Sequence, residues 1–142
     1  MGNNDIKWDG KVYPYIPSEP LKIDPVIKLQ EKIEEDLDPI SFEVIRYAMW
    51  NINVEQGNTL LRVSGSPIAA YGHDFNPCLL DEKGDFVFFG PFLQYLSSAT
   101  GSAVKWTLEN RSSNPGISDG DIFLTNDPWV GATHQTLSLI HI

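Results

Sequence analysis

The sequence predicts an α+β fold, because helix-type and strand-type patterns follow one another without the regular βαβ alternation of a parallel sheet. Three segments carry apolar residues at helical spacing, and between the second and the third a pair of short apolar runs flanks a turn containing glycine. The 142 residues suffice for one domain with a core of its own. A hydrophobic content of 42% and a charged content of 20% are ordinary for a globular protein.

The charge and cysteine content exclude several classes of protein. A net charge of −9 argues against binding to nucleic acid or to an anionic membrane surface, because both need clustered Lys and Arg. The single cysteine, Cys78, excludes an internal disulfide and cannot supply a thiolate zinc cluster. No signal peptide opens the sequence and no apolar stretch is long enough to span a membrane, so we expect a soluble, cytoplasmic protein.

Residues 1–37 are expected to form an N-terminal arm and a short helix. The first 19 residues are rich in Pro, Tyr and Trp, as in GKVYPYIPSEP, and recurring prolines exclude a regular helix. This segment is either an extended arm anchored on another surface by its aromatic residues or a disordered leader. Asp24-Pro25 is a helix start signal, and apolar residues at helical spacing then predict a helix over Pro25–Asp36.

A second helix is predicted after Asp38-Pro39, which repeats the start signal. It continues through SFEVIRYAMWNINVEQGNTLLRV, with Ile45, Met49, Ile52 and Leu60 close to one face, and its second half is weakened by a glycine.

A hairpin and a third helix follow. The hairpin is predicted from Cys78–Leu80 and Phe86–Phe89, joined by a turn over Asp81–Asp85. The segment SSATGSAVKWTLENR predicts a helix that ends before the Asn-Pro-Gly turn at 114–116. A short strand, Ile122–Thr125, then leads into a loop.

Candidate site residues are Asp74 after His73, the pair Asn126-Asp127, and His134. Each has an ordinary structural alternative, because Asp and Asn commonly cap turns and a lone histidine is commonly solvated. Carboxylate and imidazole ligands suit manganese, iron or zinc, so these residues could form part of a metal site. The sequence has no P-loop and no Gly-x-Gly-x-x-Gly motif, which indicates that ATP would be bound by another subunit or domain.

The last six residues, LSLIHI, allow two interpretations. They back-translate to CTG TCT CTT ATA CAC ATC, which matches the mosaic-end adapter of transposase sequencing libraries. We therefore expect residues 137–142 to be an adapter artefact, with the authentic sequence ending at Thr136. The alternative is a buried strand at a natural terminus.

Three collinear blocks resemble the hydantoinase B/oxoprolinase family. They are DPISFEVIRYAMWNINVEQGNTLLR, HDFNPCLLDEKGDFV and GDIFLTNDPWVGATH, and they cover about residues 38–136. The last block is similar to a family signature that falls here on Gly120, Asp121, Asn126, Asp127, Pro128, Gly131 and His134. The resemblance implies the N-terminal part of a hydantoinase B/oxoprolinase domain. The segment GSAVKWTLENRSSNPGISDGDIF looks closer to the acetone and acetophenone carboxylase branch.

That branch implies an ATP-dependent ketone carboxylase whose hydantoinase-A-like partner subunit binds ATP and phosphorylates substrate and bicarbonate. The hydantoinase-B-like subunit is implied to hold a divalent metal, manganese in acetone carboxylase, through a His-x-x-Asp motif. His134 matches the first ligand of that motif, whereas position 137, where Asp is expected, holds Leu. Asp74, Asn126 and Asp127 are implied to line the substrate and metal pocket as catalytic residues.

Three functions remain open on the sequence. The first is the ketone carboxylase, and the second is ATP-dependent hydrolysis of a lactam or hydantoin. The branch histidine expected before the third helix is missing from PFLQYLSSATG, which leaves the substrate, ketone or lactam, undecided. The third is a non-catalytic accessory subunit that clamps a larger partner through its arm. We expect the 142-residue polypeptide alone to be inactive, because it has no nucleotide motif and only one residue of the implied metal set.

Overall fold

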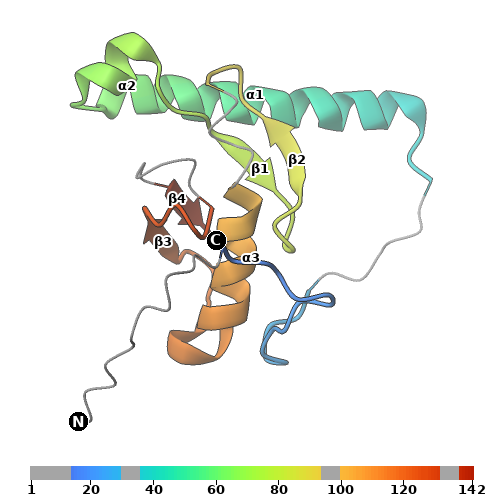
Figure 1. The fold of residues 1–142 in the computed structure, drawn as a ribbon. Helices are drawn as coiled ribbons and strands as arrows, with labels where there is room; N and C mark the ends of the chain where they lie inside the picture. The colour runs from blue at the N-terminus through green and yellow to red at the C-terminus, as the bar shows by residue number, and fades with distance from the viewer. Residues whose placement is uncertain (1–13, 30–35, 94–99, 132–137) are drawn as a thin grey trace.

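The computed structural model describes residues 14–29, 36–93, 100–131 and 138–142. It has an α+β fold, as predicted, in which helices combine with two small antiparallel sheets (Figure 1). The elements in chain order are α1 (Pro39–Val63), α2 (Pro67–Gly72), β1 (Cys78–Leu80), β2 (Phe86–Phe89), α3 (Thr100–Arg111), the π-type turn η2 (Ser112–Gly116), β3 (Ile122–Thr125) and β4 (Ser138–His141). Within the described ranges, no helix combines the length and the apolar character needed to cross a membrane.

Helix α1 begins where the sequence predicts it. The Asp38 side chain accepts hydrogen bonds from the backbone N–H groups of Ile40 and Ser41, and Pro39 occupies the first turn. The helix continues through Gly57, so the glycine does not shorten it.

The packed face of α1 differs from the expected one. Ile45, Ile52 and Leu60 stay exposed, whereas Asn53 and Gly57 are the buried residues. Gly57 is buried because the ring of Phe92 occupies the space that a Cβ atom would need. A small residue, rather than an apolar one, therefore marks the contact between α1 and the chain after β2.

The helix predicted over Pro25–Asp36 is wrong at its start. Asp24 instead closes a turn, in which its side chain accepts the N–H of Val26 and its carbonyl accepts the N–H of Ile27. The residues from there to position 29 are not helical, and residues 30–35 lie outside the described part of the chain. The same Asp-Pro pair is thus followed by a local turn here and by a long helix at α1, so this start signal alone does not decide whether a helix forms.

Strands β1 and β2 form the predicted antiparallel hairpin, with an irregularity between Leu79 and Leu80. The Asp81 carboxylate accepts the N–H groups of Lys83 and Asp85, and Gly84 takes a φ of +80° in the turn. A Cβ atom on Gly101 would collide with the carbonyl oxygen of Gly84, so the turn rests directly on the first turn of α3.

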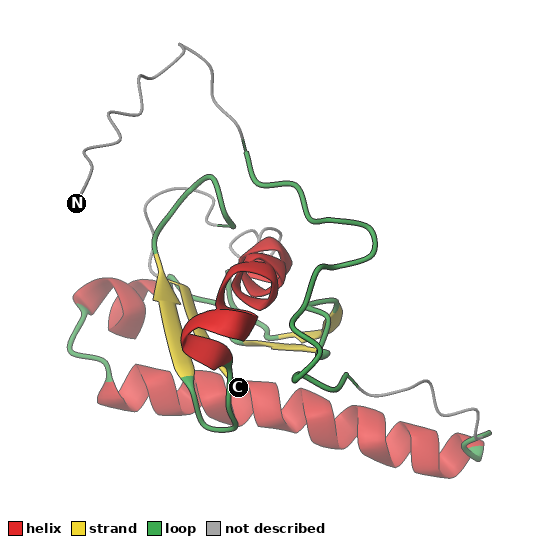
Figure 2. Cartoon of the chain, turned by 90° about the horizontal axis from the view of Figure 1, so that it is seen from below, coloured by secondary structure: helices red, strands yellow, loops and turns green. Residues whose placement is uncertain are grey.

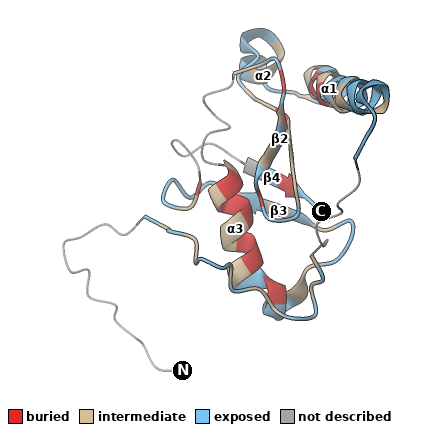
Figure 3. Ribbon diagram, turned by 90° about the vertical axis from the view of Figure 1, so that its right-hand side faces the viewer, coloured by how far each residue is buried: buried red, intermediate tan, exposed pale blue. Residues whose placement is uncertain are grey.

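Helix α3 carries the core. Its residues Ala103, Val104 and Leu108 are buried together with Ile140 of β4, and Leu80, Phe123 and Ile117 pack around them. Figure 3 shows this buried side of α3, and Figure 2 shows that α3 runs crosswise to the long helix α1. The predicted helix is confirmed over residues 100–111, while residues 97–99 lie outside the described ranges.

The arm packs against α3 over the part that the structure describes. Residues 14–24 are mostly extended, and Leu21 and Ile23 pack on the core cluster. The described residues 14–24 thus lie on a surface of the same chain, and the N-terminal arm and short helix over residues 1–37 stay a prediction. Residues 1–13, which include the first tryptophan, lie outside the described ranges.

Strands β3 and β4 pair in antiparallel register, with Phe123 opposite Ile140. The strand over residues 122–125 is confirmed. Strand β4 falls within the six residues that match the adapter, and it buries Ile140 while Leu139 stays 60% exposed. Any hexapeptide with alternating apolar residues can pair with the free edge of β3. The adapter origin of residues 137–142 therefore stays a prediction.

Candidate functional site

Asp127 lies at the end of β3, in a tight turn that its own groups build. Its Oδ1 atom accepts the N–H of Trp129 at 2.9 Å, and its carbonyl accepts the N–H of Val130 at 3.1 Å. Its N–H points back to the hydroxyl of Thr125 at 3.3 Å. Asp127 therefore stabilises a turn, which is the structural alternative given for it above. The residue is exposed, and none of the hydrogen bonds within the described ranges uses its Oδ2 atom, which leaves one carboxylate oxygen for a ligand.

The loop that carries Asn126 and Asp127 is tied to the arm. The backbone N–H of Tyr15 donates to the carbonyl of Trp129 at 2.9 Å. The hydroxyl of the same tyrosine donates to Glu109 Oε2 on α3 at 2.7 Å. Tyr15 therefore links the candidate site loop to the core helix, and Asn126 and Asp127 project from a loop that is fixed at both sides.

Glu109 holds the arm through more than one bond. Its Oε1 atom accepts the backbone N–H groups of Ser18 at 3.2 Å and Lys22 at 3.0 Å. Desolvation opposes ionisation of Glu109, but these hydrogen bonds outweigh it and lower the pKa of the carboxyl group below its ordinary value. The pKa of Tyr15 is raised, chiefly by burial and then by its bond to Glu109.

Asp74 lies elsewhere, just after α2. His73 ends that helix in a left-handed conformation with a φ of 51°, and its N–H donates to the carbonyl of Ala69. The His73 ring meets Phe92 edge-on at 6.1 Å between centroids. Asp74 is exposed, and among the described residues no hydrogen bond or ion pair joins it to Asn126 or Asp127. The structure thus brings Asn126 and Asp127 together and leaves Asp74 on a separate segment.

The described residues do not by themselves fit a metal site. No group of three or more His, Cys, Asp or Glu side chains gathers within these ranges. Asp127 and Asn126 offer oxygen ligands only, and His134 lies among residues 132–137, outside the described part. Cys78 is half-buried, and burial raises the pKa of its thiol, so it remains protonated and is a poor nucleophile.

Sequence reasoning missed Asn53. Its side chain is 0% exposed, and neither its amide nitrogen nor its amide oxygen has a partner among the described residues. Asn76, before β1, has the same unpaired amide atoms. No pattern in the sequence marks Asn53 as buried, because the packed face that it shares with Gly57 is set by the distant Phe92.

Comparisons with known proteins agree on one family. The model of the hydantoinase B/oxoprolinase family matches residues 38–137. A Pseudomonas sp. (strain NS671) protein, named as the B subunit of a D-/L-hydantoinase, is 30% identical over 115 residues, which cover 72% of this chain and 18% of the relative. The 5-oxoprolinase of Saccharomyces cerevisiae is 26% identical over 101 residues, covering 71% of this chain and 8% of the relative.

A carboxylase relative matches as well. The acetone carboxylase alpha subunit of Xanthobacter autotrophicus is 29% identical over 82 residues, which cover 57% of this chain and 11% of the relative. The chain thus spans less than a fifth of the length of these relatives. No solved structure is significantly similar to it.

Proposed function

The chain belongs to the hydantoinase B/oxoprolinase family, and from this premise we propose that it is part of the substrate-binding and metal-binding subunit of an ATP-dependent enzyme that acts on a small carbonyl compound. Carboxylation of a ketone, as in the acetone carboxylases, is the first candidate reaction. The observation that carries the proposal is the loop after β3. It lies inside the family match and presents Asp127, one of whose carboxylate oxygens is not used by the turn.

The proposed roles follow the chemistry of each group. Asn126 and Asp127 lie side by side on the anchored loop. Their side chains bind and orient either the carbonyl substrate or a group that is bound to the metal. Asp74, which follows α2, is proposed as a further residue of the same pocket. His134 is proposed as a ligand of manganese or a similar ion, which would supply Lewis-acid polarisation of a carbonyl oxygen. No catalytic step is assigned to the metal, because the described residues do not complete its ligand set.

ATP is proposed to be bound by a hydantoinase-A-like partner subunit or domain, because the sequence has no nucleotide-binding motif of its own. The relatives include the B subunit of a hydantoinase and the alpha subunit of a carboxylase, names that belong to multi-subunit enzymes. A kinase-like partner would activate the carbonyl compound or bicarbonate, and this subunit would hold the activated molecule.

The second candidate is hydrolysis of a lactam or hydantoin. The match to the hydantoinase relative favours it, because it extends over 115 residues rather than the 82 matched in the carboxylase. Both candidates need ATP and a carbonyl substrate, and they differ in the second reactant, which is bicarbonate for the carboxylase and water for the hydrolase.

The test uses the subunit expressed from its source DNA together with a hydantoinase-A-like subunit from the same organism. ATP consumption is measured with acetone or acetophenone and ¹⁴C-bicarbonate, and separately with hydantoin or 5-oxoproline. Incorporation of ¹⁴C that requires ATP, ketone and both subunits is the expected result. ATP-dependent ring opening without bicarbonate would establish the second candidate instead. Absence of ATP-dependent turnover with every substrate would reject both, and each subunit assayed alone is the control.

A further inference from the structure

Helix α1 carries a second apolar surface that no described residue covers. A helix at the surface of a complete globular domain is normally polar on the side that faces solvent. Here Ile40 is 77% exposed, Val44 63% and Tyr47 58%, and they lie in the half of α1 that precedes its buried residues Asn53 and Gly57. Phe42, Trp50 and Ile52 of the same helix are exposed as well. A helix with this many exposed apolar residues is typical of one that packs against a further neighbour.

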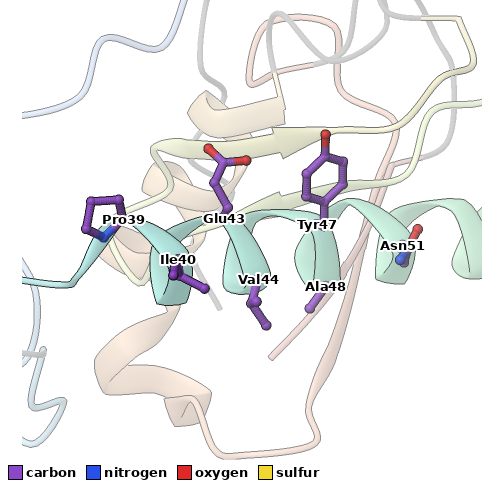
Figure 4. Close-up of a pocket in the computed structure, with 7 residues that line it drawn as sticks. All are labelled: Pro39, Ile40, Glu43, Val44, Tyr47, Ala48 and Asn51. Carbon is purple, nitrogen blue, oxygen red and sulfur yellow. The ribbon is translucent and has the colours of Figure 1, made fainter.

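The exposed surface has the form of a groove between two rows of side chains. Residues four positions apart form one row on a helix. The first row is Ile40, Val44 and Ala48, and the second is Pro39, Glu43, Tyr47 and Asn51. Figure 4 shows the two rows on opposite sides of the groove. A groove between two such rows accepts a row of side chains from another helix, which is the commonest way in which helices pack.

The side chains that line the groove determine which kind of segment can bind in it. Its floor and walls are apolar except at Glu43 and Asn51. The Glu43 carboxylate is already paired with Arg46 at 2.6 Å, so the rim needs no further cation. The Asn51 carboxamide lies on the same row as Tyr47 and offers a donor and an acceptor to a polar residue opposite. The occupant is therefore an amphipathic helix with apolar residues at helical spacing and one hydrogen-bonding residue.

The charge of the chain argues against a second copy in this groove. Each copy carries a net charge of −9, and like-charged copies repel. The relatives, by contrast, extend far beyond the matched region, since the chain covers only 8–18% of their lengths. We infer that the groove between Ile40, Val44 and Tyr47 of α1 receives an amphipathic helix from the part of the longer subunit that lies outside this sequence. The inference rests on family membership and not on the reaction proposed above.

The test measures thiol labelling in the longer subunit expressed from its source DNA. All variants carry Cys78→Ser and have every cysteine outside this sequence replaced by serine. A single cysteine is then introduced at the groove by Val44→Cys or, as the control, at the exposed hairpin turn by Lys83→Cys. Val44→Cys replaces an apolar side chain with one of similar size, so folding should survive. We expect maleimide to label position 44 at least about tenfold more slowly than position 83 in the longer subunit.

Three results would overturn the inference. Equal labelling rates at the two positions would show that the groove is open. Protection that appears only after the hydantoinase-A-like subunit is added would assign the groove to that partner. Protection that rises with protein concentration would assign it to a second copy.

Discussion

The Tyr15 hydroxyl donates a hydrogen bond to Glu109 Oε2 at 2.7 Å, although the two residues are 94 positions apart in the sequence. The backbone of Tyr15 also holds the loop of Asp127 through Trp129. One residue of the arm therefore connects the core helix α3 to the candidate site, and the first two predictions concern this connection.

Replacing Tyr15 with Phe should loosen the arm. Tyr15→Phe removes the bond to Glu109 and keeps the backbone bond to Trp129, which should cost about 1 kcal/mol of arm docking. Tryptic cleavage after Lys22 should then become about fivefold faster. Tyr71→Phe is the matched control, because Tyr71 is 88% exposed. Equal cleavage rates in the two variants would show that the hydroxyl does not hold the arm.

The arm should stay docked only within a window of pH. The folded pKa of Glu109 is lowered, so its contribution is present above the ordinary pKa of a glutamate, about 4.3, and is lost as the pH falls through the folded value. The folded pKa of Tyr15 is raised, so its contribution is present below about 10 and is lost as the pH rises further. Hydrogen-exchange protection of the Ser18 and Lys22 amides should fall at both ends of this window. Glu109→Gln should remove the acid limb, and an unchanged acid limb in that variant would contradict the assignment.

A methyl group at Gly57 should separate α1 from the chain after β2. The added Cβ would overlap the Phe92 ring, so Gly57→Ala should lower the free energy of unfolding by about 1–3 kcal/mol despite the better helix propensity of alanine. Gly65→Ala is the control, since a Cβ there meets nothing within 4 Å. Urea unfolding followed by circular dichroism measures both. Adding Phe92→Ala to Gly57→Ala should recover part of the loss by removing the overlap, and a stable Gly57→Ala protein would refute the contact.

The buried Asn53 should tolerate an apolar replacement better than a charged one. Its amide has no partner among the described residues, so Asn53→Leu, whose side chain branches at Cγ in the same way, should raise the free energy of unfolding by about 1 kcal/mol. Asn53→Asp should lower it by about 3 kcal/mol or more, because it buries an unpaired charge. A loss of stability in Asn53→Leu, seen in the same urea unfolding assay, would show that the amide has a partner.

Two substitutions at Asp127 separate its role in the turn from its charge. Asp127→Asn keeps an oxygen that can accept the N–H of Trp129, whereas Asp127→Ala removes it. In the longer subunit, both should lower ATP-dependent turnover by about 10- to 100-fold if the charge acts on substrate or metal. Only Asp127→Ala should be impaired if the turn alone matters.

The ligand role proposed for His134 is tested in the same longer subunit. His134→Ala should reduce bound manganese below about a tenth of the wild-type content by metal analysis, and full occupancy would reject the ligand proposal.

Local chemistry explains which parts of the fold were predictable. The Asp38 cap, the Asp81 turn and the short apolar run of β3 act within a few residues, and the elements they define appear where expected. The turn at Asp24 has cap chemistry similar to that of α1, although its backbone N–H donates to the Ser112 hydroxyl, so the cap alone does not decide whether a helix follows. The packed face of α1 was equally beyond reach, because it is set by Phe92, a residue 35 positions from Gly57.

In the candidate site, too, the features set by neighbouring residues were predictable, and those set by long-range contacts were not. The turn at Asn126-Asp127 was foreseen, since a strand followed by Asn-Asp-Pro is local information. Its anchoring by Tyr15 was not foreseen, because that contact joins distant segments. The grouping of Asp74 with Asp127 needed a long-range contact that the described residues do not make.

The length of α1 turns a small contact into a lever. The helix has 25 residues and, in Figure 1, reaches well past the hairpin on the side of its first residues. Asp38 lies about 28 Å along the axis from Gly57, so a rotation of about 5° at the Phe92 contact would displace the start of the helix by about 2.5 Å. The contact between the Phe92 ring and Gly57 therefore helps to set the direction of α1. A small rotation of the helix at this contact would displace the groove of Ile40 and Val44 by a larger distance.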